Sequence, residues 1–406
     1  MTAGAIARLL PACYTVGMKN ALLIQNAKLA SAATLKSNCG ILISQDGRIA
    51  DVFEMSDFDA QRHAADELYD AKGQIVTPGL IDTHIHGVGG FGTDDGKPEA
   101  ILGMSETLAK FGVTSFLPTL YAGRPEKMEK EARAILEAMG KEQGARILGI
   151  NFEGPFLSPL RAGAQDPASI SEPSAEVFQH FIDICKGHLV CMTVAPELNN
   201  IEKIAAIAQK ENIVLLSGHT NATYEQAERG VELGIKHATH MFNAMPDIGH
   251  KDLKISGAAL IDDRFSCELI SDGVHVNKDL VKYVATKKPN GKVVLITDSL
   301  TPAGLGKGTF VANGTKVVLG DRGAFVNAEN PDLLCGSALT LNRAVGNLTS
   351  WGVEVEKVVA MATQNPANIY GLKDIGIIKK GHRADISVFD ENFNAVAVFI
   401  AGKRRK

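Results

Sequence analysis

Paired cysteines and long apolar runs are both scarce in this 406-residue sequence. The six cysteines are scattered, at positions 13, 39, 185, 191, 267 and 335, and no CxxC pair occurs. This usage excludes a disulfide-rich scaffold and is typical of a reduced, cytoplasmic protein. No apolar run approaches the ~18 residues that cross a bilayer, so no membrane partner is expected.

Positive charge is not in excess either. Lysine and arginine number 42 against 46 aspartate and glutamate, which gives a net charge of -4. This balance leaves no excess of positive charge that would indicate nucleic-acid binding. No G-x-G-x-x-G follows the first apolar run of the central region, which weakens a dinucleotide-binding interpretation. A hydrophobic content of 45% is that of a globular protein with a sizeable core.

The chain ends suggest one small domain and one separate extension. Residues 18–77 and 370–406 both contain short, partly alternating apolar segments divided by Gly and Asp turns, which predicts a small β-sandwich domain formed from both termini. Residues 1–17 contain an Arg and an apolar patch and faintly resemble a targeting segment. An unstructured extension, with the natural start at Met18, is the alternative.

The region 78–369 has a different pattern. Eight near-continuous apolar runs occur at 79–86, 113–120, 146–154, 189–197, 213–220, 236–245, 265–273 and 293–299. Amphipathic helical segments separate most of them, which predicts parallel strands covered by helices. Eight such units favour an α/β fold of the (β/α)8 TIM-barrel type. A doubly wound open sheet is the alternative.

Polar residues gather where these runs end, and in a barrel those ends form the functional mouth. His84 and His86 are two apart on the first strand and therefore face the same side. Later strand ends carry further polar residues: Glu153, His219, His240, Asp272, His275 and Asp298. Imidazole and carboxylate groups in this number predict a divalent metal site. His237 lies three residues before His240 and faces the opposite side of an extended strand, so it is assigned a structural role.

The motifs resemble a known family. PGLIDTHIHG, TDS near the eighth strand end and GxxADISVFD at the C-terminus resemble the metal-dependent amidohydrolase superfamily. NFEGPFL, SGHTNA, HMFNAM, SDGVHV, TDSLTPAG and LLCGSALT resemble its N-acetylglucosamine-6-phosphate deacetylase branch, in that branch's order. The resemblance covers nearly the whole chain from about residue 20. It implies the barrel, the small β-sandwich and usually a homodimer.

The resemblance also implies roles for individual residues. Glu153, His219 and His240 match the principal metal ligands, and Asp298 matches the catalytic aspartate, which also completes the ligand set. His84 and His86 match a second metal position, so one or two ions per subunit are expected. Zinc is the first expectation, with iron, manganese or cobalt as alternatives. Substrate contacts are implied for Ala164, Gln165, Asn243, Ala244, Lys251, His275, Leu334, Cys335 and Gly336.

Two of these positions depart from the family pattern. Gln165 stands where the family usually has a histidine near the acetyl carbonyl, and an amide cannot be cationic. Lys251 stands where the family usually has an arginine that reaches the sugar phosphate from a neighbouring subunit. Lysine binds phosphate as a point charge without the planar fork. Both departures bear on which sugar is bound.

The expected function is hydrolysis of the N-acetyl group of N-acetyl-D-glucosamine 6-phosphate to acetate and D-glucosamine 6-phosphate. Asp298 is the expected general base, because it is the strand-eight acid with no evident competing partner. An N-acetylgalactosamine-6-phosphate deacetylase or another amidohydrolase is the alternative within the class. A non-catalytic scaffold with the same fold is a distant alternative, because such proteins tend to lose metal ligands.

Overall fold

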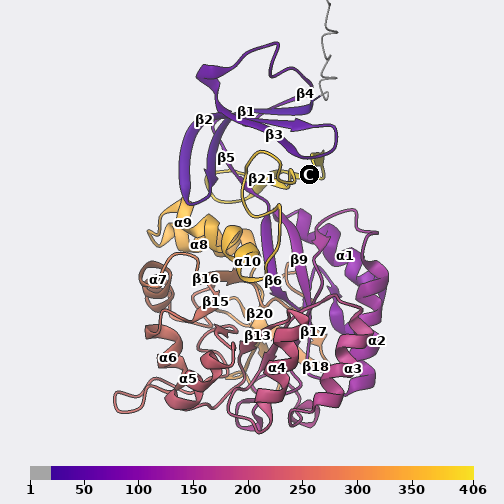
Figure 1. Ribbon diagram of the computed structural model, residues 1–406, viewed down its shortest axis with the longest axis vertical. Coiled ribbons are helices and arrows are strands. Elements are labelled where there is room, and N and C mark those ends of the chain that lie inside the picture. The colour runs from indigo at the N-terminus through magenta and orange to yellow at the C-terminus, as the bar shows by residue number, and fades with distance from the viewer. Residues whose placement is uncertain (1–19) are drawn as a thin grey trace, which may run out of the picture.

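The computed structural model describes residues 20–406 as two parts, a β-sheet unit and a larger barrel (Figure 1). The prediction made for residues 1–17 lies outside the described residues. The sheet unit lies at one end of the molecule and includes both the first and the last described strands.

The sheet unit combines strands from both ends of the chain. Its strands are β1 (Asn20–Ser31), β2 (Thr34–Ser44), β3 (Ile49–Glu54), β4 (Ala65–Asp70), β5 (Ile75–Pro78), β21 (Ile386–Phe389), β22 (Ala395–Ile400) and β23 (Lys403–Arg404). The order is β23-β22-β21-β5-β1-β2-β3, with β4 paired to β1. The antiparallel pairing of β21 with β5 joins the two ends, with Ser387 opposite Thr77. A core of its own includes Ile24, Ile41 and Val388.

The prediction that both termini build one small β unit is therefore confirmed. We propose the domain boundaries 18–77 plus 370–406 for this unit and 78–369 for the barrel.

The barrel contains all eight of the strands predicted in the region 78–369. They are β6 (Leu80–Ile85), β9 (Val113–Leu120), β10 (Arg146–Ile147) with β11 (Ile150–Glu153), β12 (Leu189–Val194), β13 (Val214–Ser217), β14 (His237–Ala238), β15 (Ser266–Ile270) and β16 (Val293–Ile296). The third strand is divided at Gly149, whose φ of 146° interrupts the ladder. Neighbours in the sheet follow chain order and run parallel, which is the arrangement of a barrel and excludes the doubly wound alternative.

The barrel seam is joined at its mouth. The backbone N–H of Asp298 donates to the carbonyl of His84 at 2.9 Å, and that of His86 donates to the carbonyl of Ser299 at 3.0 Å. These bonds hold the end of β6 beside the segment that follows β16. The first and eighth strands therefore bring their polar ends together, although more than two hundred residues separate them in the chain.

Helices cover the outside of the barrel (Figure 1). They are α1 (Pro98–Ala109), α2 (Pro125–Ala138), α3 (Ala175–Cys185), α4 (Ile201–Glu211), α5 (Tyr224–Glu232), α6 (Lys254–Ile261), α7 (Lys278–Lys287), α8 (Leu341–Ser350), α9 (Val355–Met361) and α10 (Gln364–Ile369). α2 is representative, because Met128, Ala132 and Ile135 repeat every three to four residues and are fully buried. Proline at its first position suits a helix start, where the N–H has no partner.

Two elements at the mouth had no counterpart in the sequence prediction. A four-stranded antiparallel sheet follows the eighth barrel strand, formed by β17 (Thr309–Ala312), β18 (Thr315–Leu319), β19 (Ala324–Asn327) and β20 (Leu334–Ser337). A hairpin of β7 (Gly87–Val88) and β8 (Phe91–Gly92) follows the first strand. Its turn uses Gly89 and Gly90, both with positive φ, a conformation that costs glycine little.

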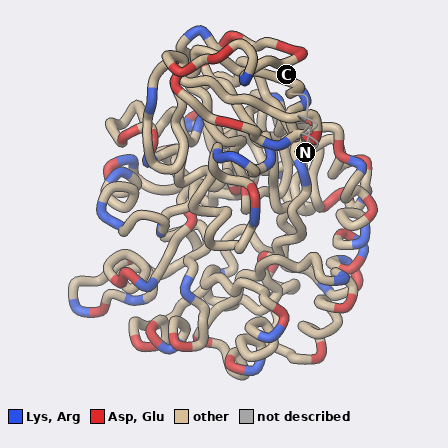
Figure 2. The backbone as a smooth tube through the Cα atoms, turned by 45° about the horizontal axis from the view of Figure 1, so that its top comes forward, with Lys and Arg blue, Asp and Glu red and all other residues tan. Residues whose placement is uncertain are grey.

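Charges are mixed over the surface. Acidic and basic segments alternate along helices and loops of both parts (Figure 2). Within residues 20–406 we find no helix with the length and apolar character needed to traverse a bilayer.

Candidate functional site

Six polar side chains from the barrel strands converge at the mouth. Glu153 ends β11, His219 and His240 lie just beyond β13 and β14, and His84 lies within β6. Their side chains are almost completely buried. His219, His240 and Asp298 adopt positive φ values of 46°, 27° and 49°, so the chain turns sharply where each side chain enters the mouth. Backbone conformations of this kind cluster at functional sites.

The first group of ligating atoms belongs to Glu153, His219 and His240. The Nε2 atoms of His219 and His240 lie 3.0 and 2.9 Å from Oε1 of Glu153 and 3.2 Å from each other. Two imidazole nitrogens that face each other and one carboxylate oxygen form a donor set suited to a divalent ion.

The second group belongs to His84, His86 and Asp298. Oδ1 of Asp298 lies 3.7 Å from Nε2 of His84 and 3.4 Å from Nε2 of His86. Both imidazoles also approach the first group, because Nε2 of His86 is 3.2 Å from Oε2 of Glu153 and Nε2 of His84 is 3.6 Å from its Oε1. Glu153 thus lies between the two groups, with Oε1 near the first group and His84, and Oε2 near His86.

The charges in the cluster stabilise one another. Burial by itself would raise the pKa of Glu153, but His219, His240 and His86 outweigh burial and hold it well below its usual range. Burial opposes the charged form of His84, yet the carboxylates of Glu268, Glu153 and Asp298 raise its pKa to about 10. Carboxylates that remain ionised at neutral pH are available as metal ligands.

The local geometry fits a metal ion. Nε2 of His84 is fully buried and has no hydrogen-bond partner among the described residues, although it faces two carboxylate oxygens. A buried polar atom without a partner is costly. An ion held by the two groups would satisfy this nitrogen and the converging nitrogens of His219 and His240.

The outer nitrogens of three histidines are held by neighbours. Nδ1 of His86 lies 3.1 Å from the carbonyl of Thr119, and Nδ1 of His219 lies 3.1 Å from that of Arg161. Nδ1 of His84 instead faces a carboxylate, Oε2 of Glu268, at 3.0 Å. Partners of this kind fix which ring nitrogen is free to bind a metal.

Glu268 is a site residue that the sequence analysis missed. It lies in β15, within the buried apolar segment SCELI, and is completely buried. An acidic side chain inside an otherwise apolar strand was the available signal, because buried carboxylates need polar partners.

A cavity of about 260 Å³ opens beside the cluster. Most residues predicted at the site line it: His86, Glu153, Ala164, Gln165, His219, His240, Asn243, Ala244, His275, Asp298, Leu334, Cys335 and Gly336. His84 lies outside this lining, completely buried. Lys251 is exposed on the loop before α6 and is not part of the lining. The lining also contains residues that were not predicted, namely Tyr121, Gly163, Leu300, Asp332 and Leu333.

Tyr121 supports the ring of His86. The two rings are stacked, with centroids 3.8 Å apart and an interplanar angle of 8°. This contact restricts rotation of the imidazole and forms one wall of the cavity.

Gln165 is engaged at both ends of its amide. Its Oε1 accepts from the backbone N–H of Ala122 at 3.0 Å, and its Nε2 donates to Oε2 of Glu153. In this arrangement the amide orients the carboxylate that lies between the two ligand groups.

His275 lines the cavity, and one of its ring nitrogens has no partner among the described residues. Its Nδ1 pairs with Oδ2 of Asp272 at 2.7 Å, and Asp272 also accepts from the backbone N–H groups of Val274 and His275. Nε2 of His275 has no partner among the described residues. The Asp272 contact therefore fixes the orientation of the ring, which forms part of the cavity lining.

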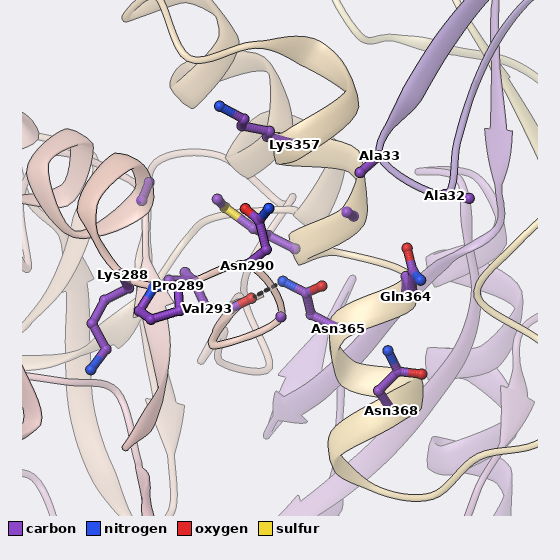
Figure 3. Close-up of a pocket in the computed structure, with 14 residues that line it drawn as sticks. Ala32, Ala33, Lys288, Pro289, Asn290, Val293, Lys357, Gln364, Asn365 and Asn368 are labelled. Carbon is purple, nitrogen blue, oxygen red and sulfur yellow. Dashed lines mark hydrogen bonds between the residues drawn. The ribbon is translucent and has the colours of Figure 1, made fainter. Parts of the chain in front are cut away.

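A second cavity, of about 270 Å³, lies at the other end of the eighth barrel strand (Figure 3). It is lined by the β1–β2 turn, the segment before β16, and helices α9 and α10. Its described lining includes amides such as Asn365 and Asn368 but no His, Cys, Asp or Glu. It therefore lacks the groups that a metal centre requires.

The barrel and its mouth define the class of the protein as a metal-dependent hydrolase of the barrel type. Residues 75–405 match the model of the amidohydrolase family. The N-acetylglucosamine-6-phosphate deacetylase of Bos taurus is 32% identical over 384 residues, which cover 90% of this chain and 92% of the relative. The N-acetylgalactosamine-6-phosphate deacetylase of Escherichia coli O157:H7 is 28% identical, with 81% and 87% of the two chains covered.

A solved structure shows the same likeness. A mutant N-acetyl-D-glucosamine-6-phosphate deacetylase from Mycobacterium smegmatis, in complex with N-acetyl-D-glucosamine-6-phosphate, superposes with a TM-score of 0.86 and 26% identity. The alignment covers 95% of this chain and 99% of that one. The chain belongs to the amidohydrolase family, in the branch of the N-acetylglucosamine-6-phosphate deacetylases.

Proposed function

We propose that this protein hydrolyses the N-acetyl group of N-acetyl-D-glucosamine 6-phosphate, releasing acetate and D-glucosamine 6-phosphate. The observation that carries the proposal is the convergence of two histidine pairs on Glu153, beside a cavity that His275 also lines. One end of this cavity suits hydrolysis of an amide, and His275 suits an anionic group of the substrate. The deacetylase relatives support the same substrate.

Glu153, His219 and His240 would hold one divalent ion, and His84, His86 and Asp298 a second. Zinc suits these imidazole and carboxylate donors, and iron, manganese and cobalt are the alternatives. Such an ion, when bound, supplies a Lewis acid for the amide carbonyl and lowers the pKa of water toward ~7.

Asp298 is proposed as the group that moves the proton. Its carboxylate lines the cavity and faces the nitrogens of His84 and His86. Burial would raise its pKa, but these histidines and His240 lower it, so it is ionised at neutral pH and can accept a proton. It takes the proton of the attacking water and returns it to the amine nitrogen as the C–N bond breaks.

The sugar phosphate would be bound by His275 together with Asn243 and Ala244. Among the described residues, no lysine or arginine lines the cavity, so one chain by itself offers little positive charge to a phosphate. We propose that Lys251 from a second copy supplies this charge and that the protein acts as a homodimer. Ala164, Gln165 and the Leu334–Gly336 segment would contact the rest of the substrate. We place the reaction in the cytoplasm, in accordance with the five described cysteines being free thiols.

The test is acetate release from a panel of N-acetylated sugars, each with and without the 6-phosphate, after loading with zinc, iron, manganese or cobalt. We expect turnover of N-acetyl-D-glucosamine 6-phosphate and little turnover of the unphosphorylated sugar. Preference for N-acetylgalactosamine 6-phosphate would establish the alternative function. That alternative is supported by the similarity to the Escherichia coli O157:H7 relative and by the glutamine at position 165. If no phosphosugar releases acetate, the proposed deacetylase activity is refuted. If the protein also binds no metal, a non-catalytic scaffold is favoured.

A further inference from the structure

Glu268 lies below the metal-ligand cluster and contacts three elements of the barrel. Its Oε2 is 3.0 Å from Nδ1 of His84 and accepts from the backbone N–H of His240 at 3.2 Å. Its Oε1 accepts from the hydroxyl of Tyr370 at 3.1 Å. The side chain is completely buried, so water does not compete for these contacts.

The ion-pair partners of Glu268 among the described residues are histidines. They are His84 at 3.0 Å and His237 at 3.9 Å. A buried carboxylate without lysine or arginine partners is expensive to keep ionised. Its presence in β15 therefore calls for a role that a neutral side chain would not fill.

The four histidines of the cluster differ in what holds their outer nitrogen. His86 and His219 face backbone carbonyls, and Nδ1 of His240 has no partner among the described residues. Only His84 has a carboxylate at this position. A carboxylate that accepts from one ring nitrogen makes the other nitrogen a stronger ligand and fixes the tautomer.

The contact has a clear consequence for His84. Nδ1 of His84 is engaged by Glu268, which leaves Nε2 as the ring nitrogen that can bind an ion. That nitrogen is buried, without a hydrogen-bond partner, and faces Asp298 and Glu153. His84 is thus arranged as a metal ligand before any ion arrives.

We propose that Glu268 is a positioning residue that determines whether the His84, His86 and Asp298 group holds a second ion. Because it bonds the backbone of His240 by the same oxygen, it also couples the two ligand groups mechanically. The inference rests on the two-ion site of the proposed function and concerns the occupancy of that site, not the identity of the sugar.

The test is the Glu268→Gln variant, which has nearly the same shape and can still accept from His84 and His240 but carries no charge. Metal dissociation constants are measured by chelator competition, and cobalt absorption spectra report the coordination at each site. We expect the weaker site to lose about 10- to 100-fold in affinity, while the tighter site keeps its affinity. The cobalt spectrum should approach that of a His84→Ala, His86→Ala double variant.

Tyr370→Phe is the matched control, because it removes a hydrogen bond to the other oxygen of Glu268 and preserves the charge. It should retain both ions. Three results would each overturn the proposal. Metal affinity could fall equally in the two variants, it could fall equally at both sites of Glu268→Gln, or it could be fully retained in Glu268→Gln.

A measurement on the unmodified chain guards against a variant that fails to fold. In zinc-loaded protein with 15N-labelled histidine, His84 should carry its proton on Nδ1, and a proton on Nε2 would overturn the inference. The wild type separates the two proposals. If the wild type binds two ions but releases no acetate, the proposed function is refuted and the inference on Glu268 stands. If it releases acetate with one tightly bound ion and no second site, the inference on Glu268 is refuted and the proposed function stands.

Discussion

The backbone at Asp298 is held in a left-handed conformation by bonds on both sides. Its N–H donates to the carbonyl of His84, and its carbonyl accepts from the N–H of Ser337 at 2.8 Å. A non-glycine residue in this region costs about 1 to 3 kcal/mol, which the surrounding structure must offset. The two bonds fix the direction in which the carboxylate enters the cavity.

The Asp298→Asn variant separates proton transfer from metal binding. Asparagine has the same shape but does not accept the proton of the attacking water, so we expect kcat to fall by about 10²- to 10⁴-fold. The ion held by Glu153, His219 and His240 should remain, as elemental analysis would reveal. Asp332→Asn is a suitable control, because Asp332 lines the same cavity and contacts none of the six ligand residues by hydrogen bond or ion pair. Retained turnover in Asp298→Asn would move the general base elsewhere.

At the scale of elements, β6 illustrates what periodicity can predict. His84 and His86 are two apart, and the alternation of a strand places both on the inner side. Their rings are 5.4 Å apart and both approach Asp298. β14 illustrates the limit of such patterns. The predicted run 236–245 is a strand only over His237–Ala238, because the chain turns at His240, where φ is 27°.

Replacing His84 in β6 and His86 just beyond it tests whether the end of this strand serves the second ion alone. We expect the His84→Ala, His86→Ala variant to bind one ion in place of two and to retain part of its deacetylation, since Glu153, His219 and His240 form a complete group without it. Metal content and kcat are measured together. Loss of both ions would show instead that the two groups form one indivisible site.

At the scale of the whole molecule, the cavity has no lysine or arginine for the phosphate among residues 20–406. Lys251 is exposed on a loop between β14 and α6, and under the proposed function a second copy would supply it. The proposal therefore predicts that substrate binding depends on the oligomeric state.

The Lys251→Ala variant should raise KM for the phosphosugar by about tenfold or more, which is the loss of one charge-assisted hydrogen bond. Turnover of the unphosphorylated sugar should not change. Mixing this variant with Asp298→Asn subunits provides a sharper test. In a hybrid dimer, the Lys251→Ala subunit keeps Asp298 and would receive Lys251 from the Asp298→Asn subunit, so a low KM should be recovered. If Lys251 acts within its own chain, the KM should not recover.

Stability also depends on a buried histidine outside the ligand groups. His237 bonds Ser266, and burial lowers its pKa from 6.5 to about 4. The unfolded chain therefore takes up a proton as pH falls through 6.5, while the folded chain does so only near 4. Stability should decrease across that interval by up to ~1.4 kcal/mol per pH unit from this group.

Urea unfolding of metal-free protein at several pH values checks this prediction. His237→Asn should make the dependence on pH shallower between 4 and 6.5. His180→Asn is the control, because His180 is about half exposed. An unchanged slope in His237→Asn would show that His237 takes up its proton over the same pH range in the folded and unfolded chains.

Patterns in the sequence were sufficient to predict the barrel, the β unit from both ends and most of the candidate site. These depend on local periodicity, and side chains at the ends of parallel strands must meet at one edge. The folded structure was needed to show which nitrogen of each histidine faces the cluster, that Gln165 bonds Glu153, and that Glu268 contacts His84. The sheet of β17 to β20 was likewise revealed only by the fold. These features depend on contacts between residues far apart in the chain, and a pattern of neighbours in sequence does not contain them.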